Sequence, residues 1–139
     1  MTIPGATNDL ETRLGNLEHP VRLVLFTQTF GCDTCLLARQ VVDQIASLSE
    51  RVTVEEHNLI LDKEKVEEYR VERAPAIAVV GDTDPGIRYY GVPAGYELAS
   101  LLEAVLLVGS REVGLSDETV SAIAAVDHPV DIKVFVTPT

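Results

Sequence analysis

The sequence is short of cysteine, of basic residues and of long apolar runs, and each shortage excludes a class of protein. Only two cysteines occur in 139 residues, so a structural zinc site built on two cysteine pairs is excluded. Acidic residues outnumber basic ones by 22 to 11, and the net charge is −11. Such a surface repels phosphate backbones and anionic lipid. We therefore expect neither nucleic-acid binding nor membrane-surface binding.

The apolar runs are too short for a bilayer span. The longest, residues 98–108, is interrupted by Ser100 and Glu103, so it is interpreted as a buried helix. The first residues show no basic segment followed by an apolar one, and we expect no secretory signal and a cytoplasmic protein. In that compartment a C-x-x-C motif is typically redox-active or metal-binding, whereas a structural disulfide is rare.

The two cysteines lie in such a motif, as Cys32 and Cys35. Residues 21–27 before them are apolar and branched, as in a buried strand, and residues 36–48 after them have apolar positions 37, 41, 45 and 48 at helical spacing. This pattern predicts a strand-to-helix turn with Cys32 near the first helical position. Free N–H groups and the helix dipole there can lower a thiol pKa from about 8.5 toward roughly 3.5–7.5. Since Cys35 lies nearly one turn further on, the pair predicts a dithiol–disulfide switch.

The rest of the chain alternates helical and strand patterns, which predicts an α/β fold. Pro75 stands directly before one predicted strand, and residues 81–86 form a turn between two strands. We predict helices at residues 7–17, 36–48, 62–69, 95–108 and 116–125, and strands at residues 21–27, 52–58, 76–80, 87–90 and 130–136. Thr7 or Asn8 can cap the first helix, Gly109 is predicted to end the fourth, and Ser116 to cap the last.

The end of the chain repeats its beginning. His128-Pro129-Val130 and Phe135 match His19-Pro20-Val21 and Phe26 in order and in spacing, with a short predicted helix before each copy. We infer a first unit at residues 1–109 and the start of a second, truncated unit at residues 110–139. The strand at 130–136 must then pair with the first unit's sheet or with another molecule, for example with a second copy in a homodimer.

Taken together, the strand, the C-x-x-C motif and a proline at position 75 that opens a later strand resemble the thioredoxin/glutaredoxin superfamily. The doubled layout resembles the N-terminal unit of protein disulfide oxidoreductases, which are glutaredoxin-like proteins of two tandem thioredoxin folds. The resemblance rests on Cys32-Asp33-Thr34-Cys35, Arg73-Ala74-Pro75, residues 90–97 and residues 134–139.

This resemblance implies a thioredoxin-like fold with a central mixed sheet, an added N-terminal helix, and a C-terminal helix and strand from the second repeat. It implies that Cys32 attacks protein disulfides and that Cys35 resolves the mixed disulfide. Pro75 would be a cis-proline that leaves the Ala74 backbone free to bind an extended substrate.

Further implied features concern the rim of the site and its partners. Phe30 and Gly31 would form part of the substrate rim, while Asp33 and Thr34 would modulate the thiol. No metal or organic cofactor is needed, and a thioredoxin-reductase-like flavoprotein would supply electrons.

Two departures from thioredoxins stand out. Asp33-Thr34 replaces the Gly-Pro pair between the cysteines, and Gly31 replaces the aromatic residue before them. Phe26 occupies the position of the buried carboxylate that accepts a proton in thioredoxins. Because Asp33 adds negative charge beside the thiolate, we expect a milder lowering of the thiol pKa.

Three alternatives to this function remain open. The chain could be an electron-relay domain of a peroxide-reducing system, although such modules keep their working cysteines in the second unit. It could be a scaffold or binding module that only retains the fold. A zinc half-site is the third, with His57 as a further ligand only if the fold brings it close.

Overall fold

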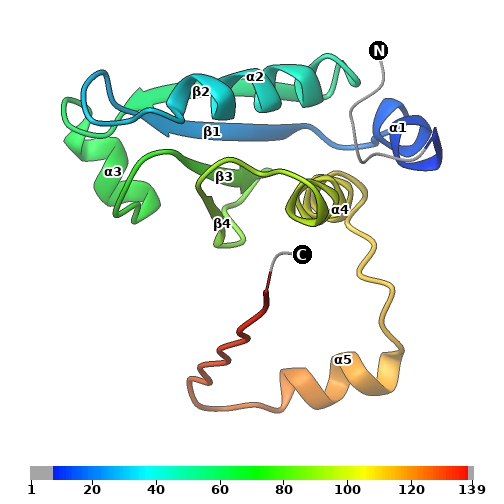
Figure 1. Cartoon of the computed structure of the whole chain (residues 1–139). Coiled ribbons are helices and arrows are strands. Elements are labelled where there is room, and N and C mark those ends of the chain that lie inside the picture. Colours follow the sequence, from blue (N-terminus) through cyan, green and yellow to red (C-terminus); the bar gives the residue numbers. More distant parts are fainter. Residues whose placement is uncertain (1–7, 138–139) are drawn as a thin grey trace.

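The computed structural model describes residues 8–137 and contains a four-stranded mixed sheet with helices on both faces (Figure 1). The strand order is β2-β1-β3-β4; β1 runs parallel to β2 and antiparallel to β3, and β4 runs antiparallel to β3. The elements are α1 (Asn8–Gly15), β1 (Val21–Thr27), α2 (Cys35–Ala46), β2 (Val52–Asn58), α3 (Lys63–Tyr69), β3 (Ala76–Val80), β4 (Ile87–Tyr90), α4 (Tyr96–Ser110) and α5 (Asp117–Ala124).

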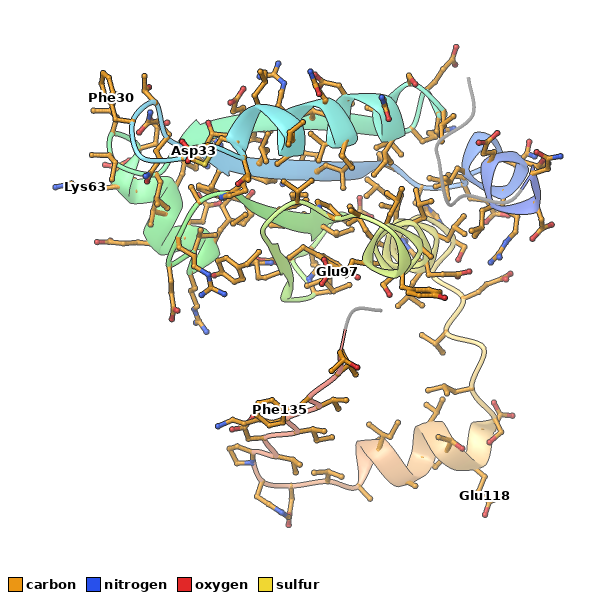
Figure 2. The ribbon with its side chains drawn as sticks, in the orientation of Figure 1. Phe30, Asp33, Lys63, Glu97, Glu118 and Phe135 are labelled. Atoms are coloured by element: carbon orange, nitrogen blue, oxygen red, sulfur yellow. A yellow bond between two sulfur atoms is a disulfide. The ribbon has the colours of Figure 1, made fainter. Side chains whose placement is uncertain are left out.

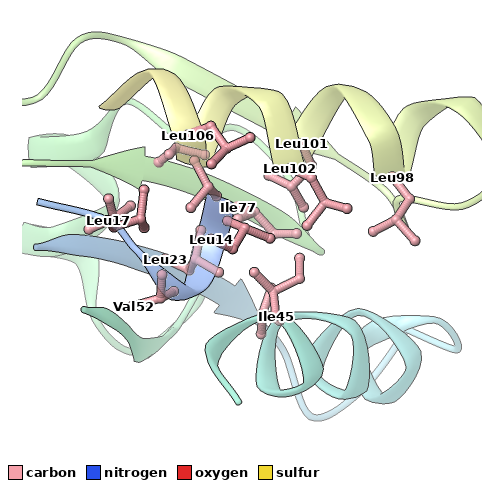
Figure 3. Packing of buried hydrophobic residues seen from close by; sticks show 14 of the residues in the cluster. Leu14, Leu17, Leu23, Ile45, Val52, Ile77, Leu98, Leu101, Leu102 and Leu106 are labelled. Carbon is pink, nitrogen blue, oxygen red and sulfur yellow. The ribbon is translucent and has the colours of Figure 1, made fainter. Parts of the chain in front are cut away.

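Strand β1 contributes side chains to two hydrophobic cores, one on each face of the sheet. Leu23 and Leu25 belong to a large cluster with residues of α1, α2 and α4, part of which is drawn in Figure 3. Val24 and Phe26 point to the opposite face, where they join Tyr69 of α3 in a smaller cluster. All four of these β1 side chains are fully buried. Their alternation follows from the period of two along a strand.

The expected α/β fold is confirmed, and the sequence placed four strands at their observed bounds, namely β1, β2, β3 and β4. Four helices also form where they were predicted, with ends shifted by a few residues. Ser116 caps α5, because its hydroxyl oxygen accepts a hydrogen bond from the N–H of Thr119. The proposed cap at Thr7 lies outside the described residues.

Helix α2 buries a different face from the predicted one. The pattern at 37, 41, 45 and 48 suggested that Leu37 faces the core, yet half of Leu37 is exposed. The buried residues are Cys35, Ala38, Val42 and Ile45. Small side chains at positions 35 and 38 let the first turn of the helix approach the sheet closely, and the two leucines at 36 and 37 are left outside.

Helix α4 does not end at Gly109, contrary to the prediction. It continues to Ser110, and Arg111 adopts the left-handed conformation that ends it. Gly109 is buried inside the helix because the chain entering β1 passes against it. A Cβ at this position would lie 2.7 Å from Leu17 Cδ2 and 3.1 Å from Val21 Cγ2, and the Gly109 carbonyl accepts a hydrogen bond from the His19 N–H at 3.0 Å. The glycine is needed for close packing within the helix.

The predicted strand at residues 130–136 is wrong for this structure. These residues form neither helix nor strand, and they do not join the sheet. Every described residue from 111 to 137 is exposed, and Figure 1 shows the chain leaving α4, passing through α5 apart from the sheet, and then turning back without joining it. A strand needs a neighbour to complete its hydrogen bonds, and this segment pairs with none of the four strands.

Within residues 8–137, no helix is long and apolar enough to cross a membrane.

The contact at Gly109 gives a prediction for stability. Replacing Gly109 with alanine should lower the free energy of unfolding by about 1–2 kcal/mol, because the added methyl group overpacks the contact with Leu17 and Val21. Gly15→Ala is the matched control, since its Cβ would lie an ordinary 3.7 Å from the Leu48 carbonyl oxygen. Urea denaturation measures both variants. A Gly109→Ala protein as stable as the Gly15→Ala control would contradict the packing argument.

Candidate functional site

The two cysteines form a disulfide at the entrance to α2. The bond joins Cys32 to Cys35, and their Cα atoms lie 5.6 Å apart. The two sulfurs differ in access: Cys35 is buried with only 7% of its surface exposed, whereas Cys32 is half-buried. An approaching sulfur can therefore reach Cys32 more easily than Cys35.

Cys32 lies before the helix, although α2 begins within one residue of the predicted range 36–48. Thr34 is the N-cap and Cys35 the first helical residue, so the prediction of Cys32 near the first helical position is wrong. The first helical hydrogen bond runs from the Ala38 N–H to the Thr34 carbonyl at 3.0 Å. Asp33 and Thr34 are both typical N-cap residues, but the Thr34 side chain makes no capping hydrogen bond. The free N–H groups of the first turn still point back toward the segment that holds Cys32.

A side-chain hydrogen bond within the loop fixes the backbone before Cys32. The Gln28 side-chain amide donates to the Phe30 carbonyl at 2.9 Å, a contact that sequence reasoning missed. Gly31 has φ +73°, in the region that favours glycine. Phe30 is 88% exposed and its ring points outward at the end of the molecule (Figure 2). The predicted rim residues Phe30 and Gly31 thus lie on an exposed loop that leads directly to Cys32.

The segment before β3 is held from the side by β4. The peptide bond between Ala74 and Pro75 is cis. The Pro75 carbonyl accepts a hydrogen bond from the Gly91 N–H at 2.9 Å, and the Arg73 guanidinium lies over the Tyr90 ring, 4.2 Å from its centre. Among the described residues, neither the N–H nor the carbonyl of Ala74 makes a backbone hydrogen bond.

The sheet register brings this segment to the cysteine end of the molecule. Phe26, next to the last residue of β1, pairs with Ala76, the first residue of β3. The chain that enters β3 through Pro75 and the chain that leaves β1 toward Cys32 therefore share one edge of the sheet. The segments that hold the sequence-predicted site residues, although far apart along the chain, therefore lie at the same end of the sheet.

A third loop lies at the same edge, and sequence reasoning did not identify it. The Leu59 N–H donates to the Thr27 carbonyl at 2.7 Å, which ties the end of β2 to the end of β1. The Asn58 side-chain oxygen accepts hydrogen bonds from the N–H groups of Ile60 and Leu61 at 2.9 and 3.1 Å. Ile60 and Leu61 remain exposed. The loop therefore presents two apolar side chains beside the disulfide end of β1.

A buried aromatic ring occupies the position of the missing carboxylate. Phe26 is completely buried, and its ring contacts those of His57 and Tyr69. His57 is held in turn by Glu55, whose Oε1 lies 2.6 Å from His57 Nε2. The pKa of Glu55 is lowered by this hydrogen bond and by the ion pair with Arg22 at 2.8 Å. His57 is thus engaged by a carboxylate on the α3 face of the sheet.

A polar cluster faces α2 at the end of the sheet. Glu56 of β2 accepts a hydrogen bond from the Thr27 hydroxyl at 2.8 Å and forms an ion pair with Arg39, which also contacts Asp43 at 3.0 Å. Arg39 lies one helical turn after Cys35, so the two share one side of α2. This cluster links the helix that carries the disulfide to both strands at the cysteine end.

In the part of the chain that the structure describes, no group of three or more histidine, cysteine, aspartate or glutamate side chains could hold a metal ion. His57 in particular is paired with Glu55 rather than with the cysteines.

Comparison with known proteins supports the thioredoxin resemblance. No family model matches the chain. The chain is 33% identical over 79 residues to a probable thioredoxin of Methanothermobacter thermautotrophicus, and this match covers 56% of the chain and 87% of the relative. It is 30% identical over 99 residues to an NADH dehydrogenase of Ferdinandcohnia aciditolerans, a match that covers 70% of the chain and 17% of that protein.

Two solved structures share the fold over most of the chain, each at 26% sequence identity. The N-terminal domain of the alkylhydroperoxide reductase AhpF of Enterococcus faecalis matches with a TM-score of 0.78, covering 86% of the chain and 58% of that structure. A protein disulfide oxidoreductase of Aeropyrum pernix matches with a TM-score of 0.73, covering 84% of the chain and 52% of that structure. The chain thus spans just over half of either structure.

The Glu55 carboxylate gives a prediction for the pH dependence of stability. Because folding lowers its pKa, its contribution is complete above the ordinary carboxyl pKa and is lost as pH falls through the folded value. Glu55→Gln should therefore lower the free energy of unfolding by about 1 kcal/mol at pH 7, and the difference from the unmodified protein should shrink below about pH 4.

Denaturation by urea across this pH range measures the effect, with Glu50→Gln, at an exposed position, as the matched control. A loss of stability that stayed constant down to low pH would show that packing, and not the charge of Glu55, is responsible.

Proposed function

The chain belongs to the thioredoxin family, and from that premise we propose that it is a thiol–disulfide oxidoreductase acting on protein disulfides. The observation that carries this proposal is the Cys32–Cys35 disulfide at the entrance to α2, with one sulfur half-buried and the other buried. The difference in access supports different roles for the two sulfurs, with Cys32 as the attacking thiolate and Cys35 as the resolving thiol.

The proposed cycle begins with the reduced dithiol. The Cys32 thiolate attacks one sulfur of a substrate disulfide; a mixed disulfide forms and the other substrate sulfur leaves as a thiolate, which takes up a proton. Cys35 then loses its proton and attacks the Cys32 sulfur. The Cys32–Cys35 bond forms, the mixed disulfide breaks, and the second substrate sulfur leaves as a thiolate. Two electrons have passed from the protein to the substrate.

The surroundings of the disulfide support a polypeptide substrate. The N–H and carbonyl of Ala74 are free of backbone partners within the described residues, so an extended substrate chain can pair with them beside Pro75. Phe30 and Gly31 form the opposite side of this approach. Asp33 and Thr34 are exposed between the cysteines, where they can modulate the attacking thiolate.

The cycle needs no metal or organic cofactor within the chain, because the two sulfurs carry both electrons. Repeated turnover needs an external electron donor, and we propose a thioredoxin-reductase-like flavoprotein. A cytoplasmic location would keep the dithiol reduced and ready to attack.

We propose that the chain has two parts, of which only the first contains the redox-active cysteines. Residues 1–109 are proposed as the active unit, and residues 110–139 as the start of a second thioredoxin-like unit. Helix α5 supports this division, because its bounds match those of α1 when the two copies of the repeat are aligned: Asp117 falls on Asn8 and Ala124 on Gly15. The exposed segment after α5 supports a second copy of the chain as a further partner.

An electron-relay role in a peroxide-reducing system is the second candidate function. It is supported by the likeness to the N-terminal domain of the alkylhydroperoxide reductase AhpF, at a TM-score of 0.78. The two roles use the same dithiol and differ in the partner to which the electrons pass.

The cysteine roles can be tested by substitution. Cys32→Ser should abolish insulin reduction in the presence of a thiol donor, because the attacking sulfur is gone. Cys35→Ser should trap a mixed disulfide between Cys32 and the substrate, because the resolving sulfur is missing. Non-reducing electrophoresis and mass spectrometry measure the trapped species. Activity that survives Cys32→Ser would overturn the assignment.

Phe30 provides a test of the substrate rim. Since its ring is almost fully exposed, Phe30→Ala should leave stability unchanged. It should raise KM for insulin by about fivefold, equivalent to roughly 1 kcal/mol of lost contact, while reduction of a small aromatic disulfide stays unchanged. Phe135→Ala is the matched control, because Phe135 is 91% exposed and lies far from Phe30 (Figure 2). Equal effects of the two substitutions would refute a specific role for Phe30.

A further inference from the structure

The segment before Pro75 carries a positive charge that the fold leaves available. Arg73 is exposed, and its guanidinium lies over the Tyr90 ring, 4.2 Å from the ring centre. Within residues 8–137, the Arg73 side chain forms no ion pair. The charge therefore stands at the cysteine end of the sheet without a carboxylate partner among the described residues.

A second arginine that lies over a ring is used within the fold. The Arg88 guanidinium is 5.6 Å from the centre of the Tyr69 ring, and it donates to the Tyr69 carbonyl at 2.8 Å and to both carboxylate oxygens of Asp84. Arg73 has the same support from a ring but no such carboxylate. Because the five N–H donors of a guanidinium lie in its plane, contact of its face with a ring leaves them available to a ligand.

The ring beneath Arg73 is itself fixed in place. Tyr90 pairs with Ala76 in the sheet, and the Tyr90 hydroxyl oxygen accepts a hydrogen bond from the Glu72 N–H at 3.2 Å. The ring is thus tied to the chain on both sides of Ala74. The guanidinium of Arg73 therefore has a defined position, although the side chain is exposed.

This position borders the proposed path of the substrate. Ala74, the residue whose backbone is free to pair with an extended chain, directly follows Arg73. Successive residues of an extended chain are about 3.4 Å apart, so residues that flank the substrate cysteine pass within reach of the guanidinium.

The charges along this path differ in sign. Asp33, exposed between the cysteines, places a negative charge beside Cys32, whereas Arg73 places a positive one beside Ala74. Glu72 is exposed as well, and a substrate carboxylate competes with it for Arg73. An acidic substrate residue is therefore attracted on one side of the reacting cysteine and repelled on the other.

We propose that Arg73 selects substrates that carry an acidic residue close to the reacting cysteine, on the flank that runs past Ala74. The guanidinium binds the carboxylate through charge-assisted hydrogen bonds. This inference rests on the proposed reduction of protein disulfides and adds the class of polypeptide that the site prefers.

Peptide disulfides of defined charge provide the test. The probes are symmetrical disulfides of a short peptide with one cysteine, in which glutamate, glutamine or lysine stands within two residues before or after that cysteine. The reduced protein is mixed with excess probe, and formation of the Cys32–Cys35 disulfide is followed by acid quenching, alkylation and mass spectrometry. Glutamate on one flank should raise the rate constant about threefold to fivefold over glutamine. On the other flank it should give no gain.

Substitutions at Arg73 separate its charge from a structural role. Arg73→Gln should abolish the gain, Arg73→Lys should retain part of it, and Arg73→Glu should reverse it, so that the lysine peptide reacts faster than the glutamate peptide. Arg51→Gln is the matched control, because Arg51 is exposed, forms no ion pair within residues 8–137 and precedes β2 at the opposite end of the sheet. Since glutamate also changes the reactivity of its own cysteine, the comparison is made between proteins for each peptide.

The outcomes distinguish this inference from the proposed function. Reduction of every peptide with no preference on either flank, or a preference equal in Arg73→Gln and Arg51→Gln, would overturn the role of Arg73 and leave the oxidoreductase function standing. An unmodified protein that reduces none of the peptides would overturn both.

Discussion

The register of β1 against its two neighbours is the constraint on which the site depends. Because β1 pairs in parallel with β2 and antiparallel with β3, its final residues adjoin the end of β2 and the beginning of β3. Three loops that are far apart in the sequence are thereby brought to one edge. They contain the cysteines, the Asn58 turn and Pro75. A register slip of one residue would also turn the side chains of β1 to the wrong faces, so the two cores and the site are fixed together.

The alternation of side chains along β1 also places apolar and polar groups on opposite faces at the end of the strand. Phe26 points into the small core beneath α3, while the next residue, Thr27, points toward α2 and bonds Glu56. The polar groups near the disulfide are therefore arranged at the end of the sheet, where Glu56 and Arg39 are partly exposed, and the strand interior remains apolar. The charges of Glu56 and Arg39 are thus held at the end of the sheet without full burial, which would be costly.

The sequence predicts those parts of the fold that depend on local residue patterns, namely the helices and strands. It also predicts the cysteine chemistry of the site. Strands β1 and β3 are mainly apolar runs and β2 begins with alternating apolar and polar residues, while the C-x-x-C motif and Pro75 are recognisable by residue type and spacing. The errors and omissions depend on contacts between distant residues. Gly109 is a helix-ending residue by type, yet Leu17 and Val21 require a glycine inside the helix. The Asn58 turn and the free backbone of Ala74 likewise depend on where another part of the chain lies. Cys32 was placed too close to the start of α2 for a different reason, because an apolar period indicates that a helix exists and does not fix its first residue.

The internal repeat shows why pattern alone cannot define a strand. Residues 21–27 and 130–136 have nearly the same alternation, and the first is the centre of the sheet while the second pairs with nothing in residues 8–137. The difference lies in the neighbours of each copy, since β1 is completed by β2 and β3 and by the helices that pack on them. A segment forms a β-strand only beside another strand, because its backbone N–H and carbonyl groups need hydrogen-bond partners there. The same sequence signal therefore builds the core of the sheet in one place, whereas within residues 8–137 the other copy stays exposed and outside the sheet.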